Sequence, residues 1–74
     1  MAEKRRNTEL LEKIAKRIKD LRAEHDVTQE VFYNDTGINI GRIERAKRDV
    51  GITTIQIICE YFKISLNDFF KKIK

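Results

Sequence analysis

The sequence predicts an all-α fold built from five helices. Apolar residues recur along most of the chain with a helical period, and cap-forming residues precede the apolar stripes. No run combines strand-like alternation with turn signals on both sides. The chain has no proline and three glycines, so little interrupts the helices. We therefore expect one helical domain over residues 8–74, preceded by a flexible polar N-terminal arm over residues 1–7.

The first helix is predicted from a stripe of apolar residues. Either Thr8 or Asn7 can cap its start, and the helix should end near His25 and Asp26. Its buried stripe is expected to consist of Leu10, Ile14, Ile18 and Leu21. Its other faces carry the basic residues Lys13, Lys16, Arg17, Lys19 and Arg22.

A short second helix is predicted over about residues 29–33. Thr28 can cap its start, and Val27 can pack on Phe32 as a hydrophobic staple. Residues 34–37, Asn-Asp-Thr-Gly, then interrupt the helix because each of them favours a cap or a turn.

A third helix is expected over residues 36–46, capped by Asp35 or Thr36. Ile40 and Ile43 set its period and face the core, which excludes a strand because Ile43 breaks the alternation. The outward face then carries Ile38, Gly41, Arg42 and Arg45. Two placements of Ile38 remain open: outward, or inward if the helix begins later.

Two further helices complete the prediction. Thr53 and Gln56 form a capping-box pair at the start of the fourth helix. Its apolar stripe consists of Ile55, Ile58, Cys59 and Phe62. In the last helix Ser65 is expected to act as the cap, with Ile64 packing on Phe69. The last stripe consists of Leu66, Phe69, Phe70 and Ile73.

Composition limits the classes of function. The 74 residues carry a net charge of +4 and have a pI near 9.4, which suits an anionic partner such as nucleic acid. A lone Cys59 fits a reducing, cytoplasmic setting, and no stretch approaches the roughly 20 apolar residues of a membrane span. With one serine, one histidine and no phosphate-cradling glycine loop, we expect no enzyme activity, no cofactor and no metal site.

Three pieces of the sequence resemble a known family when taken in order. They are Arg22 with Gln29 seven positions later, RIERAKR from Arg42 to Arg48, and TIQIICEYFKISLNDFF from Thr54 to Phe70. Together they resemble the XRE-family regulators, which are helix-turn-helix DNA-binding proteins of the Cro and phage-repressor type. The resemblance covers about residues 14–70 and implies a compact lambda-repressor-like domain.

The resemblance also implies roles for individual residues. Gln29 matches a glutamine that lies against a DNA phosphate, and Arg22 and Glu44 match a structural salt bridge. The positions nearest the base edges match Thr36, Gly37, Ile38 and Asn39. The positions that contact the DNA backbone match Arg42, Arg45, Lys47 and Arg48. With Gly41 on the same outward face, these residues form the predicted DNA-binding set.

The chain departs from the family pattern in three places. It has three residues fewer between Gln29 and Glu44, and Tyr33 and Ala46 stand where an alanine and a glycine are common. We expect the second helix to be the shortened element, because Asn-Asp-Thr is typical of the cap of the next helix.

The expected function is sequence-specific DNA binding by a transcriptional regulator, a repressor that acts by occupying its promoter. The family implies a homodimer formed through the C-terminal helices, where Tyr61, Phe70 and Ile73 are candidate interface residues. The alternative is a protein-interaction module, such as an antitoxin or an accessory subunit, that binds a partner protein.

Overall fold

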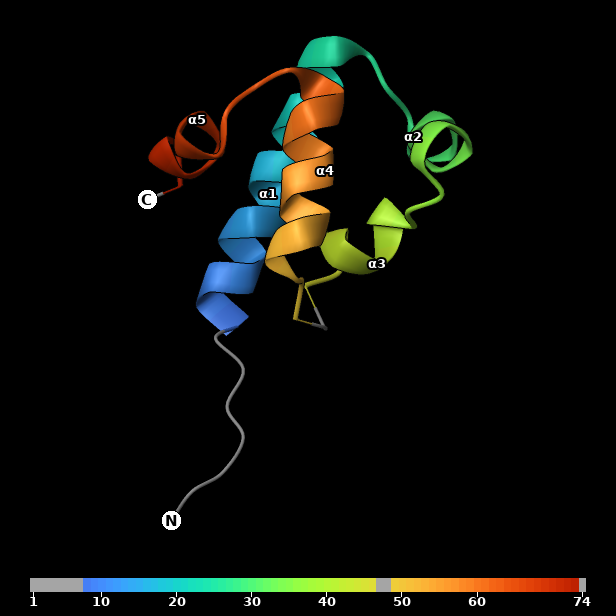
Figure 1. Ribbon diagram of the computed structural model, residues 1–74. Coiled ribbons are helices and arrows are strands. Elements are labelled where there is room, and N and C mark those ends of the chain that lie inside the picture. Colours follow the sequence, from blue (N-terminus) through green and yellow to red (C-terminus); the bar gives the residue numbers. More distant parts are fainter. Residues whose placement is uncertain (1–7, 47–48, 74) are drawn as a thin grey trace.

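The computed structural model describes residues 8–46 and 49–73, which form five helices and no strand. The helices are α1 (Thr8–His25), α2 (Gln29–Thr36), α3 (Ile40–Glu44), α4 (Ile52–Phe62) and α5 (Leu66–Lys71). α1 and α4 lie in the middle, with α2 and α3 on one side of them and α5 on the other (Figure 1). The prediction of a compact all-α fold is confirmed.

All five helices contribute to one hydrophobic core. Ile18 of α1, Phe32 of α2, Ile58 of α4 and Phe69 of α5 are completely buried, and Ile40 of α3 is 1% exposed. Full burial of such a side chain contributes about 1.5–3 kcal/mol, so the single buried residue of a short helix is enough to anchor it.

The buried face of α1 contains Ile14, Ile18 and Leu21 as predicted, but it begins at Leu11 instead of Leu10. Leu11 is buried whereas Leu10 is 41% exposed, so the prediction for Leu10 is wrong. Leu11 belongs to the stripe because it precedes Ile14 by three residues and Ile18 by seven, which is also helical spacing. Arg17 lies on the same face and is buried, although it was predicted on a polar face.

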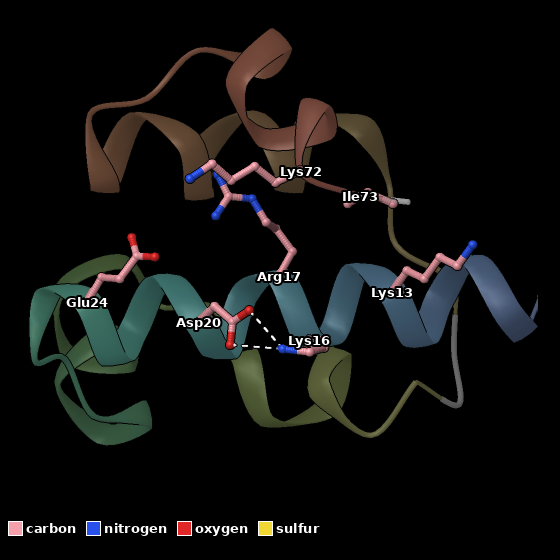
Figure 2. Close-up of a pocket in the computed structure, with 7 residues that line it drawn as sticks. All are labelled: Lys13, Lys16, Arg17, Asp20, Glu24, Lys72 and Ile73. Atoms are coloured by element: carbon pink, nitrogen blue, oxygen red, sulfur yellow. Dashed lines mark hydrogen bonds and ion pairs between the residues drawn. The ribbon is translucent and has the colours of Figure 1, made fainter.

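Arg17 is buried because its guanidinium group closes the end of α5. Its Nε donates to the carbonyl of Phe69 at 3.0 Å, and its Nη2 donates to that of Asp68 at 3.3 Å. Carbonyls in the last turn of a helix have no partner within it, and a cation is favoured at that end of the helix dipole. Figure 2 shows Arg17 extending from α1 toward α5, beside Lys72.

α2 is longer than predicted. Thr28 caps it as predicted, since its Oγ1 accepts from the amide of Val31 at 3.1 Å. The helix continues beyond residue 33 to Thr36, and Gly37 ends it with a φ of 78°. Asn34 and its neighbours therefore extend the helix instead of interrupting it.

α3 is the short element of the pair, with five residues. It begins at Ile40, so the expected start at Asp35 or Thr36 is wrong, and its N-cap is Asn39. The expected role of Asn34, Asp35 and Thr36 as the cap of the third helix is also wrong, because all three residues belong to α2.

The last two helices begin differently from each other. α4 starts at Ile52 after the N-cap Gly51, with no side-chain cap, so the predicted capping box of Thr53 and Gln56 is wrong. Ser65 caps α5 as predicted, because its Oγ accepts from the amide of Asp68 at 3.0 Å. None of the helices described here has the length and apolar character needed to cross a membrane.

Candidate nucleic-acid interface

α2, the turn at residues 37–39 and α3 form a helix-turn-helix on one side of the molecule (Figure 1). Thr36 holds the turn with its side chain. Its Oγ1 donates to the carbonyl of Phe32 at 2.8 Å and accepts from the amide of Ile38 at 3.1 Å. Gly37 supplies the left-handed conformation that ends α2, and its amide donates to the carbonyl of Tyr33 at 2.7 Å. The direction of the chain entering α3 is thus fixed by local bonds.

The carboxylate of Glu44 joins α1, α2 and α3. Arg22 of α1 donates to it from Nε at 2.7 Å and from Nη2 at 2.9 Å, a two-bond geometry that fixes both side chains. Gln29 of α2 donates to the same carboxylate from Nε2 at 3.0 Å. The Glu44 side chain is only 3% exposed, and its hydrogen bond raises the pKa of Arg22.

Arg22 also donates from Nη1 to the carbonyl of Val27, at 3.1 Å, in the connection between α1 and α2. The group of Arg22, Gln29 and Glu44 therefore holds the first two helices and the end of α3 in one arrangement. We call this group the Glu44 lock.

The side chains presented to solvent near α3 are fewer than predicted. Arg42 is exposed, and so are Asn39 and Arg45, the residues that flank the helix. Gly41 was expected on the outward face, but it is buried against the side chains of Gln29 and Asn39. Arg42 and Arg45 are exposed as predicted, and Gly41 is buried because the side chains of Gln29 and Asn39 cover it.

The other predicted residues divide into three groups. Ile38 takes the inward placement, since it is half-buried and packs on the core. Thr36 and Gly37 lie at the end of α2, where the Thr36 side chain bonds the backbone. Lys47 and Arg48 lie outside the described residues. The structure therefore gathers four exposed candidates around α3: Gln29, Asn39, Arg42 and Arg45.

A shallow groove of about 360 Å³ runs beside these residues. Ile38 and Ile43 line it, together with Val50 and Thr54, which sequence reasoning did not select. Asp49 and Arg42 also line the groove, and Asp49 adds a carboxylate, a hydrogen-bond acceptor. The sequence pattern gives no sign of these residues, because the connection between α3 and α4 and the first turn of α4 supply them.

A second groove, of about 490 Å³, lies between α1 and the end of α5 (Figure 2). Its polar groups largely bond within the protein: Lys16 pairs with Asp20 at 3.0 Å, and Arg17 bonds the carbonyls of α5. Over residues 8–46 and 49–73 there is no cluster of histidine, cysteine or acidic side chains that could hold a metal ion. The surface around α3 is therefore the better candidate site.

Comparison with known families agrees with this geometry. Residues 17–74, more than half of the chain, match the family model described as a Cro/C1-type HTH DNA-binding domain. Searches of curated proteins and of solved structures each returned no match.

Proposed function

Since the chain belongs to the family of Cro/C1-type helix-turn-helix DNA-binding domains, we propose that it is a sequence-specific transcriptional regulator. In this proposal α3 enters the major groove of duplex DNA, which is wide enough to admit a helix. The protein acts as a dimer and represses transcription by occupying a promoter in the cytoplasm.

One observation carries the proposal: the Glu44 lock ties α3 to α1 and α2 while leaving Arg42 in α3, and Arg45 just beyond it, exposed. A fixed helix with free guanidinium groups is suited to DNA, because Arg bonds both guanine edges and phosphates. The net charge of +4 favours the encounter with a polyanion. Gln29, at the first turn of α2, lies close enough to α3 to contact the same duplex.

The test is selection from a pool of random duplexes across a salt series, followed by sequencing of the retained DNA. We expect an enriched palindrome whose half-sites lie about one helical turn apart. Affinity should fall with a log–log salt slope of roughly −0.9 for each phosphate neutralised. Steep salt dependence without enrichment would reject sequence-specific readout and leave a basic protein that holds phosphates.

A second candidate function is protein interaction, as in an antitoxin or accessory subunit. It is favoured by the small number of outward side chains on α3, of which only Arg42 is exposed among the five residues. It is also favoured by exposed apolar side chains elsewhere, including Ile52, Leu66 and Phe70. Absence of DNA binding at low salt, together with a stable complex with a partner protein, would support it.

A further inference from the structure

Gly41 lies directly beneath two amide side chains. A β-carbon at this position would lie 3.1 Å from Oε1 of Gln29 and 3.3 Å from Oδ1 of Asn39. Both distances are shorter than ordinary van der Waals contact, so any larger residue must displace these amides. Gly41 has no positive φ, so the backbone conformation does not require glycine there. The requirement comes from the space above the helix.

The two amides are held differently. Glu44 accepts from Nε2 of Gln29 at 3.0 Å, which turns Oε1 toward Gly41. Asn39 makes no side-chain cap bond to α3, and its side chain bonds no other described residue. Its amide is therefore available to a ligand, and the amide of Gln29 stands beside it in a fixed orientation.

Glycine at position 41 lowers the stability of α3. Glycine is a poor helix former, and α3 has only five residues with which to sustain its bonds. Alanine would strengthen α3 if helix formation were all that mattered. The two amides above the helix supply the reason for glycine.

We propose that Gly41 is a positioning residue for DNA contact. Because Gly41 has no side chain, the amides of Gln29, at the start of α2, and Asn39, at the start of α3, lie side by side. There they contact the phosphates or base edges of a duplex. This inference rests on the proposed function and deepens it. The amides act on DNA, and Gly41 acts through them.

The test compares four proteins: the wild type, Gly41→Ala, Gln29→Ala and the double variant. The melting temperature of each is measured without DNA, and its affinity for a selected duplex is measured across a salt series. Removing the Gln29 side chain takes away the closest contact of the added methyl group, so it reverses the effect of alanine at position 41.

In the wild-type background, Gly41→Ala should lower the melting temperature and weaken DNA binding about threefold to tenfold, the range expected for one neutral hydrogen bond. The salt slope should stay unchanged, since an amide releases no counterions. In the Gln29→Ala background the same substitution should raise the melting temperature and weaken binding less than in the wild-type background, because only Asn39 Oδ1, at 3.3 Å, still meets the added methyl group.

The inference would be overturned if Gly41→Ala changed the melting temperature, or the affinity for DNA, equally in the wild-type and Gln29→Ala backgrounds. A reduced salt slope would also overturn it, because displaced basic contacts would then explain the loss. Failure of the proposed function gives a different result: the wild type itself would bind no duplex. In that case the melting temperatures would still report whether Gly41 makes room for Gln29.

Discussion

At the scale of single residues, Arg42 is the side chain through which α3 reads bases in the proposed function. Ile40, Gly41 and Glu44 are buried, and Ile43 is half-buried, so Arg42 is the one exposed residue within the helix. An arginine in the major groove most often bonds O6 and N7 of a guanine, and each such pair discriminates by about 1–3 kcal/mol. If α3 reads bases directly, Arg42 is the residue best placed to do so.

Replacing Arg42 by alanine should weaken binding to the selected duplex by about 1–3 kcal/mol and relax specificity at one base pair. Lys71→Ala is the matched control, because it removes one positive charge from α5, on the other side of the molecule (Figure 1). Competition against a library of singly altered sites measures both effects. Equal weakening on every site would make Arg42 a phosphate contact.

Ala46 has a left-handed conformation, with a φ of 59°. Residues other than glycine adopt the left-handed region at a cost of roughly 1 kcal/mol. The amide of Ala46 donates to the carbonyl of Ile43 at 2.9 Å, and this bond closes the end of α3. Position 46 therefore suits glycine.

Ala46→Gly should raise the free energy of unfolding by about 0.5–1 kcal/mol, because glycine relieves the backbone strain. Ala23→Gly is the control, since Ala23 lies in regular α1 and should lose a similar amount. Urea denaturation of both variants measures the two changes. Destabilisation by both substitutions would show that the conformation at residue 46 carries no strain.

At the scale of elements, the sequence predicts the number and type of helices but misplaces α3. Asn34, Asp35 and Thr36 can end one helix or begin the next, and their sequence preferences are the same in both roles. Thr36 bonds backward to Phe32, so it ends α2. The available signal was Gly37, which is typical of the position after a helix end. The period of Ile40 and Ile43 gave the buried side of α3 correctly, but it did not show that Gln29 covers Gly41.

Arg17 of α1 supplies side-chain hydrogen bonds to two C-terminal carbonyls of α5. Arg17→Lys keeps the positive charge but loses the planar guanidinium, whose Nε and Nη2 donate to the carbonyls of Phe69 and Asp68. We expect a loss of about 1–3 kcal/mol in the free energy of unfolding and faster amide exchange in α5. Lys16→Ala is the control, since its exposed pair with Asp20 should contribute less than about 0.5 kcal/mol. Equal small losses would mean that Phe69 alone holds α5.

A hydrogen bond between Tyr61 and Asp35 links α4 to α2, with its two oxygens 2.5 Å apart. The Tyr61 hydroxyl donates this hydrogen bond to the Asp35 carboxylate, which raises the pKa of Tyr61 above its usual value of about 10. Since the pKa is higher in the folded state than in the unfolded state, the stabilisation is complete below about pH 10. It is lost as the pH rises through the higher value of the folded protein.

Tyr61→Phe should therefore lower the melting temperature at neutral pH, and its difference from the wild type should shrink above about pH 10. The ring contact with Phe32, with centroids 4.8 Å apart, can persist in the variant. Tyr33→Phe is the control, because the Tyr33 hydroxyl bonds no described residue. A difference that stays constant with pH would mean that ionisation of Tyr61 does not matter.

At the scale of the whole molecule, features that depend on local interactions could be predicted from the sequence, whereas features that depend on long-range contacts mostly could not. Helical periods and caps are local, so the fold class and most helix starts follow from the sequence. The burial of Arg17 and the space above Gly41 depend on residues brought together from distant elements. Of the long-range contacts, the pair of Arg22 and Glu44 was expected from the family resemblance, and the bond of Gln29 to Glu44 was not.

The last helix, α5, carries two large apolar side chains that are exposed to solvent. Leu66 and Phe70 are four residues apart on α5 and are 38% and 37% exposed, so they form an apolar pair on one face. Tyr61 and Ile73, the other candidates for the dimer interface, are half-buried. A second copy of the chain is the partner that the proposed repressor needs, because two helix-turn-helix units read a palindrome together.

Phe70→Lys should therefore shift the protein toward the monomer and weaken its binding to a palindrome far more than its binding to a single half-site. The reason is that a buried lysine cannot be solvated at an apolar interface, whereas Phe69 of the same helix keeps the monomer folded. Asn67→Lys, on another exposed position of α5, is the control. Sedimentation over a range of concentrations, and titration of one-site and two-site duplexes, measure both effects. If Phe70→Lys weakens binding to both duplexes equally, dimerisation does not run through this face of α5.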